Sequence, residues 1–305
     1  MAADGSTTGR AAALNSVLAR PGRAARTGRF FLRRPLAAFS VGIVGILCVV
    51  AALAPAIATH DPITIYPAER LSGPSLDHFF GTDSLGRDTF SQAVYGARVS
   101  LLVGLLATAL GTVAGMLLGT ISAYVGGWVD TLLQQLSDAI MAIPAIIFLM
   151  LVGSVLGQGM FNVIWALALV FTPYVSRIVR GAVLSIREAP YVESARVAGA
   201  GPLRIMAVHI LPNAMPLVIV TASVLVGSAM LAEGALSFLG LGIPSDDPTW
   251  KVSWGSMLSP DRLRHIEQAP WLTIYPGVAL TLAVLGFNLL GDTLRDALDP
   301  RLRGT

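Results

Sequence analysis

The apolar positions of this chain fall in long runs rather than in alternating patterns. A run of about 20 apolar residues is the length of an α-helix that crosses a bilayer. Because backbone polar groups in lipid need partners within their own segment, such runs predict helices. The sequence therefore predicts an all-α polytopic membrane protein with six transmembrane helices, at residues 36–58, 99–124, 132–152, 163–183, 215–239 and 271–290.

Two of these runs carry residues that predict their shape. Pro144 lies inside the third run, and a proline in a helix interior removes a hydrogen bond and bends the helix. The second run carries a stripe of small residues, which lets a second helix approach closely. We expect that stripe to serve packing rather than ligand binding. Its members are Gly104, Gly111, Gly115 and Gly119.

The polar segments between the runs predict four parts of the chain. We expect a flexible cytoplasmic tail at 1–35, and a first helix with an extracytoplasmic loop at 36–98. A core of five helices follows at 99–292, interrupted by a polar loop at 190–212, and a second cytoplasmic tail covers 293–305.

The first apolar run is preceded by Arg33 and Arg34, as in a secretory signal peptide. The run is about 23 residues long, whereas the apolar core of a signal peptide has about 7 to 15. The first helix is therefore expected to be retained.

Composition excludes an ordinary soluble domain. The chain is 54% hydrophobic and 13% charged, with a mean hydropathy of +0.70, whereas soluble domains have about 25% charged residues. A net charge of +3 is too small to indicate a nucleic-acid partner. The lone cysteine, Cys48, cannot form an internal disulfide.

The distribution of basic residues predicts the orientation. Of the 21 basic residues, 15 lie in the two tails and the stretch 177–204, and six lie in the other loops. Basic residues concentrate on the cytoplasmic side of membrane proteins. Both termini and the loop at 190–212 are therefore expected in the cytoplasm.

The polar loop at 190–212 has a helical pattern of its own. Tyr191 and Ala195 are four residues apart, so a helix places them on one face and leaves Glu193 and Arg196 on another. Gly199 suits the end of that helix. After a bend, residues 203–210 are expected to form a second short helix that ends before Pro212. An ordinary glycine-capped connector explains the spacing equally well.

The loop ahead of the second run ends in FGTDSLGRDTFSQAVYGAR, residues 80–98. Asp83, Arg87 and Asp88 have the chemistry of a metal or phosphate site, but no histidine or further carboxylate cluster completes a ligand set in the sequence. A charged and capped start of the next helix is the favoured interpretation.

Two carboxylates fall inside apolar runs, Asp138 and Glu233. Each would cost about 2.5 to 3.5 kcal/mol at a helix centre facing lipid, so both should face protein or water. Asp138 matches Arg177 or Arg180 in depth, which predicts an ion pair. Glu233 lies toward the outer end of its run, where it lines a pathway or pairs with Arg98.

Motifs for catalysis are missing from the sequence. No GxxxxGK[ST] loop occurs, and the single lysine, Lys251, lies in an outer loop, so the chain cannot hydrolyse ATP by P-loop chemistry. The four histidines have no HExxH or paired metal spacing. We expect no enzyme activity, no cofactor and no metal ligand in this chain.

Several stretches resemble one protein family. Glu193, Ala195, Gly199, Leu211 and Pro212 match the EAA loop of ABC-transporter permeases, with departures at Ser194 and His209. The string at 80–98 resembles the signature of C-type permeases from dipeptide, oligopeptide and nickel importers. Its signature positions are Gly81, Thr82, Asp83, Gly86, Arg87 and Asp88. Further matches are LAEGALSFLGLGIP at 231–244, WGSML at 254–258 and FNLLGDTLRDALDPRLR at 287–303.

The resemblance implies a type I ABC importer permease fold in a bacterial cell membrane. It implies as partners a second permease subunit, two ATPase subunits or domains that bind ATP and Mg, an extracytoplasmic substrate-binding protein and membrane lipid. Coupling to the ATPases would involve Tyr191, Glu193, Ala195, Arg196, Gly199, Leu211 and Pro212. Di- and oligopeptides are the expected substrates. Nickel chelates, glutathione, and an ATP-independent carrier or channel are the alternatives.

Overall fold

The computed structural model describes residues 35–244, 249–250 and 252–298, and within them every regular element is helical. The all-α prediction is therefore confirmed. Five helices are long and apolar enough to cross a membrane. The predictions for the two tails fall mostly on residues outside the described part. The five helices are α3 (Pro35–Ala52), α5 (Thr89–Val125), α8 (Met160–Arg187), the stretch Pro202–Phe238 that ends in α11 (Leu211–Phe238), and α14 (Trp271–Leu298).

The third apolar run is broken rather than gently bent. It forms α6 (Gly127–Met141) and α7 (Ala145–Leu156), whose axes differ by 87°. Pro144 lies at the break with an extended ψ of 129° and immediately precedes α7. The position of the bend was predicted, and its sharpness was not.

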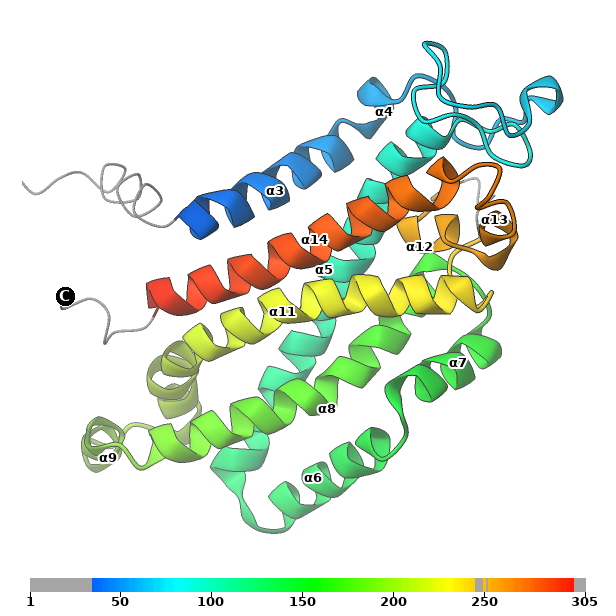
Figure 1. The fold of residues 1–305 in the computed structure, drawn as a ribbon. Helices are drawn as coiled ribbons and strands as arrows, with labels where there is room; N and C mark the ends of the chain where they lie inside the picture. Colours follow the sequence, from blue (N-terminus) through cyan, green and yellow to red (C-terminus); the bar gives the residue numbers. More distant parts are fainter. Residues whose placement is uncertain (1–34, 245–248, 251, 299–305) are drawn as a thin grey trace, which may run out of the picture. The chain divides into compact units, whose positions relative to one another are not determined.

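The α6–α7 pair crosses the membrane, because α5 and α8 run parallel. Along the interface, Gly111 faces Ala168 and Phe171, and Gly119 faces Ser176 and Arg180, so both helices advance in the same direction. Since α8 begins beside the first half of α5, the chain that leaves the end of α5 must return toward the opposite end of the helix bundle before α8 begins (Figure 1). The pair therefore supplies the sixth span, in agreement with the predicted number.

Three glycines of the predicted stripe, Gly111, Gly115 and Gly119, lie in the α5–α8 interface. A Cβ added at Gly115 would lie 2.6 Å from the carbonyl oxygen of Thr172, and one at Gly119 would lie closer still to that of Ser176. Because these obstacles are backbone atoms, no side-chain rotation can relieve them. The prediction of close packing is confirmed at this helix pair.

Helices α11 and α14 also pack against α5. Gly104 of α5 meets Val226 and Met230 of α11. Helix α14 runs antiparallel to α11, since Gly291 lies against Ser223 and Val224 while Leu280 lies against Gly234 (Figure 1). The short elements are α4 (Ala54–Ile57), a 3-10 turn (Pro67–Glu69), α9 (Pro190–Val197), α10 (Pro202–Arg204), α12 (Trp254–Met257) and α13 (Pro260–Leu263).

The prediction of a separate short helix before Pro212 is wrong. Helix α10 continues through a π-helical segment, Ile205–Ile210, directly into α11. The Leu211 N–H reaches back five residues to Met206 O, and the Asn213 side chain donates to His209 O at 2.6 Å. Such local π adjustments re-pair the backbone groups that a proline leaves without partners.

Candidate functional site

A helix–turn–helix loop extends from the end of α8 to the beginning of α11. Arg187, the last residue of α8, donates to Ala123 O at the end of α5 at 2.6 Å. Val192 of α9 is fully buried and joins Ile205 and Ile210 in the core shared by α5, α8 and α11. The loop is thus attached to the helix bundle by one apolar face and by the end of α8.

Gly199 ends α9 as the sequence predicts. Its φ is +83°, a left-handed conformation that favours glycine. The Gly199 N–H donates to Arg196 O and the Ala200 N–H to Ala195 O, each at 3.0 Å. Together these bonds form a Schellman cap. The direction in which the chain leaves α9 therefore depends on this glycine.

The outward face of the loop is partly apolar. Val197 is 83% exposed and Leu203 is 79% exposed, and Tyr191 of the same loop is half-exposed. Exposed apolar side chains grouped on one loop mark an interaction surface. Our sequence reasoning selected Tyr191 but missed Val197 and Leu203. Their large apolar side chains within a polar segment would have indicated them.

Charged residues of the loop surround a polar hollow. Glu193 and Arg196 form an exposed ion pair at 3.1 Å. They line a hollow of about 530 Å³ together with Tyr124, Arg187 and Glu188. The predicted residues Glu193 and Arg196 therefore lie beside the junction of α5 and α8, which the sequence did not indicate.

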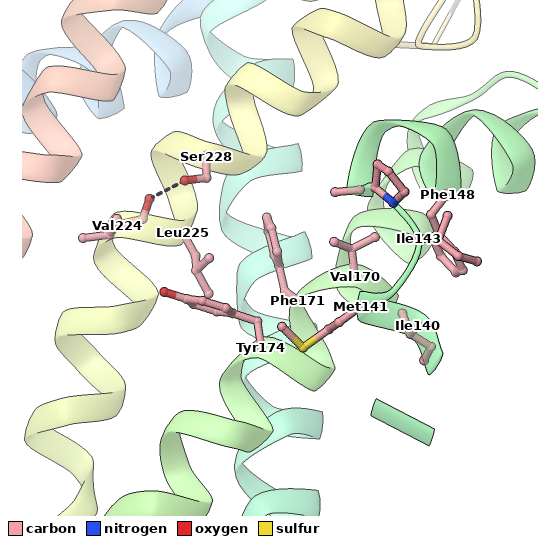
Figure 2. Close-up of a pocket in the computed structure, with 12 residues that line it drawn as sticks. Ile140, Met141, Ile143, Phe148, Val170, Phe171, Tyr174, Val224, Leu225 and Ser228 are labelled. Carbon is pink, nitrogen blue, oxygen red and sulfur yellow. Dashed lines mark hydrogen bonds between the residues drawn. The ribbon is translucent and has the colours of Figure 1, made fainter. Parts of the chain in front are cut away.

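A second, more apolar cavity opens at the α6–α7 break. Its volume is about 420 Å³, within the range of small-molecule sites. Figure 2 shows Phe171 and Tyr174 of α8 on one side, Leu225 and Ser228 of α11 on another, and residues flanking Pro144 closing the third. None of these four side chains was selected from the sequence. A proline inside a membrane span was the available sign, because broken helices line cavities.

The carboxylates of α6 both pair with arginines of α8. Asp138 forms an ion pair with Arg177, as the depth match suggested. Arg180 pairs instead with Asp130, through two hydrogen bonds of 2.6 Å. These contacts attach the first half of the broken span to α8.

Glu233 of α11 is completely buried, and its predicted pairing with Arg98 is wrong. Its Oε1 accepts hydrogen bonds from Ser253 Oγ at 2.6 Å and Ser237 Oγ at 2.8 Å. Arg98 is exposed at the surface. Ser253 is the N-cap of α12, so Glu233 anchors the loop between α11 and α14 inside the bundle.

The signature string before α5 folds as a capped turn. Asp88 Oδ2 accepts from the Ser91 N–H at 2.7 Å and so caps α5. Gly81 and Gly86 have φ values of +67° and +83°, and an added Cβ at Gly86 would overlap Tyr66 O. The interpretation as a charged and capped helix start is therefore confirmed for these residues.

Asp83 is the centre of a buried polar network in this turn. Its Oδ2 accepts from Arg87 Nε at 2.7 Å and from Arg262 Nη2 at 3.3 Å, and Arg262 also donates to Gln92 Oε1 at 2.7 Å. Burial raises the pKa of Asp83, but Arg262 and Arg87 outweigh burial and hold that pKa below its ordinary value. Burial lowers the pKa of Arg262 to about 10, opposed by Asp83.

The fold also brings histidines to the carboxylates of this turn, which the sequence did not indicate. His78 Nδ1 lies 2.8 Å from Asp88 Oδ1, and the His60 ring lies 4.7 Å from the His78 ring. Burial lowers the pKa of His78, but hydrogen bonds to Asp88 and Glu69 outweigh it and raise the pKa overall. His78 and Asp88 are 10 positions apart, and His60 is farther from both. No local spacing in the sequence therefore indicated that these three residues meet.

These features define a multi-pass helical membrane protein with a broken span, an apolar cavity beside the break and an exposed helical loop at one end. Comparison with known proteins gives the family. Residues 111–304 match the model described as binding-protein-dependent transport system inner membrane component, and residues 24–74 match the N-terminal TM domain of oligopeptide transport permease C.

The chain belongs to the family of binding-protein-dependent transport system inner membrane components. It is 40% identical over 268 residues to the dipeptide transport system permease protein DppC of Alkalihalophilus pseudofirmus, with 86% of each chain covered. It is 42% identical over 279 residues to a Brucella suis protein provisionally named as a peptide transport system permease protein, covering 91% and 92%. Members are permease subunits of ABC transporters and are not themselves enzymes.

Proposed function

We propose that this chain is one of two permease subunits of an ATP-driven importer of di- and oligopeptides. It forms half of the translocation pathway and transmits the work of separate ATPase subunits or domains, which bind ATP and Mg. An extracytoplasmic substrate-binding protein delivers the substrate. The peptide assignment rests on relatives that bear peptide and dipeptide transport names.

The observation that carries the coupling role is the construction of the loop at 190–212. Its inner face is held by Val192, while Val197 and Leu203 face outward without apolar cover in the described chain. Glu193 and Arg196 supply charge beside them. A loop that exposes both large apolar side chains and charged ones fits a protein partner.

The route from this surface to the membrane interior is short and stiff. Arg187 connects the end of α8 to the end of α5, and the glycine interface holds the two helices backbone to backbone. When the ATPases close on ATP, displacement of α9 would move α5 and α8 together. The cavity at the α6–α7 break borders α8, so this motion would change its shape and its access.

The orientation follows from charge. We propose that both termini and the coupling loop are cytoplasmic, because basic residues concentrate in the tails and around 177–204. Reporter fusions at Met1 and Thr305 should both score cytoplasmic. An extracytoplasmic reporter at either end would contradict the proposed topology.

The coupling role is tested by two glycines of one loop. An added Cβ meets nothing within 4 Å at Gly199 or at Gly201, but only Gly199 has a positive φ. Gly199→Ala is therefore expected to cost about 1–2 kcal/mol of local conformational strain, and Gly201→Ala very little. Gly199→Ala should reduce peptide uptake and peptide-stimulated ATP hydrolysis in reconstituted vesicles, whereas Gly201→Ala should leave both intact.

Two further measurements separate coupling from folding and from substrate binding. Charge reversal at Glu193 should reduce copurification of the ATPase while membrane insertion and the peptide affinity of the binding protein remain normal. Normal uptake by both Gly199→Ala and the Glu193 variant, with the ATPase still bound, would reduce the loop to a connector.

A further inference from the structure

A second cluster of chemically versatile side chains lies at the start of α5, at the opposite end of that helix from its junction with Arg187. His60, Glu69, His78 and Asp88 come from separate segments of the loop before α5. His78 lies between the two carboxylates, with Nδ1 2.8 Å from Asp88 Oδ1 and Nε2 2.8 Å from Glu69 Oε2. The His60 ring lies against the His78 ring.

Three of these side chains present metal-ligand atoms toward one another. One ligand atom each from His60, His78 and Asp88 lie within 4.8 Å of one another. In a tetrahedral zinc site with bonds of about 2.0–2.1 Å, ligand atoms are about 3.4 Å apart. His78 Nδ1 and Asp88 Oδ1 are 2.8 Å apart, so an ion between them would widen that pair by about 0.6 Å while His60 moves to the same spacing. Water would supply the fourth ligand.

The surroundings match those of a built metal site. His78 and Asp88 are buried, at 6% and 0% exposed, so their positions are fixed by packing. Glu69 accepts from the far nitrogen of His78, the arrangement that orients ligand histidines in metalloproteins. Asp88 Oδ2 is occupied as the cap of α5, which leaves Oδ1 directed at His78.

The charges also favour a divalent cation. Glu69 and Asp88 contribute two negative charges around imidazoles, while the nearby arginines Arg87 and Arg262 both bind Asp83. Imidazole and carboxylate ligands suit zinc-like transition metals, whereas Mg²⁺ prefers oxygen ligands alone.

We propose that His60, His78 and Asp88 bind a divalent transition-metal ion of the zinc class, with Glu69 positioning His78. The ion joins the beginning of the loop at residue 60 to the N-terminal cap of α5, and so stabilises the loop 60–88. The inference does not depend on the transported substrate or on ATPase coupling.

The test uses the full chain purified with its partner subunits, stripped of metal with EDTA and titrated with Co²⁺ or Zn²⁺ alone. We expect one tightly bound ion per chain, a Co²⁺ absorption spectrum of a nitrogen and oxygen site, and a raised melting temperature with Zn²⁺ but not with Mg²⁺. His60→Ala should weaken binding at least 10-fold, and Glu69→Gln about 10- to 100-fold.

His265→Ala is the matched control, because His265 lies in another loop and is not among the three ligands. It should bind like the unaltered chain. If His60→Ala misfolds, Asp88→Asn serves in its place, since it keeps an acceptor for the Ser91 N–H but loses the carboxylate. Equal binding by the unaltered chain, His60→Ala and Asp88→Asn would overturn the proposal, and so would the absence of stoichiometric binding.

Discussion

The glycine interface between α5 and α8 allows a controlled test of how the bundle is held together. Gly119→Ala places a methyl group against Ser176 O and 3.1 Å from Arg180 N, both backbone atoms of α8. Gly181→Ala makes the same change within α8 itself, at a position where nothing lies within 4 Å. The two substitutions differ in what the new methyl group meets.

The difference between these variants isolates the packing cost. Replacing glycine by alanine inside a helix is favourable by up to about 1 kcal/mol, and this gain applies to both variants. Overpacking costs about 1–3 kcal/mol. Because the obstacle at Gly119 is backbone, α8 must shift as a body, so we expect a difference near the middle of that range, about 2 kcal/mol.

The assay is thermal unfolding of the purified complex in detergent. At about 2–4 °C per kcal/mol for a chain of this size, Gly119→Ala should melt roughly 4–8 °C below Gly181→Ala. The same variant should also transmit ATP hydrolysis to transport less well, since α5 and α8 would no longer move as a unit. If the two variants melt within about 1 °C of one another, the backbone contact does not stabilise the bundle.

Three other side-chain contacts give further predictions. Asp138→Asn and Arg177→Gln should each destabilise the complex more than the double variant does, because each leaves an unpaired charge on a membrane-spanning segment; strictly additive melting shifts would contradict the pairing. Glu233→Ala should release α12 and increase protease cleavage of the adjacent loop, whereas Glu233→Gln, which keeps an acceptor for the serines, should have a smaller effect. Arg262→Met should destabilise the complex, but by less than the roughly 3–5 kcal/mol of an unpaired buried charge, because Asp83 keeps its ion pair with Arg87. Because the pKa of Asp83 is lowered in the folded chain, its ionised form contributes stability that is complete above the unfolded pKa of about 4 and is lost as the pH falls through the folded pKa. A melting temperature of the unaltered chain that does not change in acid would refute this contribution.

The sequence was most informative where lipid or backbone sterics determine the outcome. Membrane spans were visible because a bilayer requires a fixed length of apolar helix, and α8 extends only a few residues beyond the predicted 163–183. The glycine stripe of α5 was visible because close helix approach requires small residues on one face. Gly199 was visible because a left-handed helix end favours glycine.

The sequence was least informative where segments distant along the chain meet. Arg262 reaches Asp83 across 179 positions, and His60 meets Asp88 from the other end of a loop without regular spacing. Glu233 appeared to need a cationic partner, but two serine hydroxyls supply its hydrogen bonds instead. Such pairings depend on how the helices pack, which local patterns do not specify.

The π-helical segment between α10 and α11 has a consequence for insertions and deletions. A π turn accommodates about one residue more than an α turn, and each residue of an α-helix corresponds to a rotation of about 100°. Removal of one residue from Ile205–Ile210 would let the stretch become continuous α-helix while α11 keeps its place in the bundle. The part before the deletion would keep its orientation, because the π turn already held the extra residue. Removal of one residue from the regular α-helical part of α11 would instead turn everything before it by about 100°, and Leu203 would face a different direction. The π turn therefore allows two homologous subunits to differ by one residue at this point and still present the same face of the loop to the same partner, whereas a one-residue difference elsewhere in the helix would not.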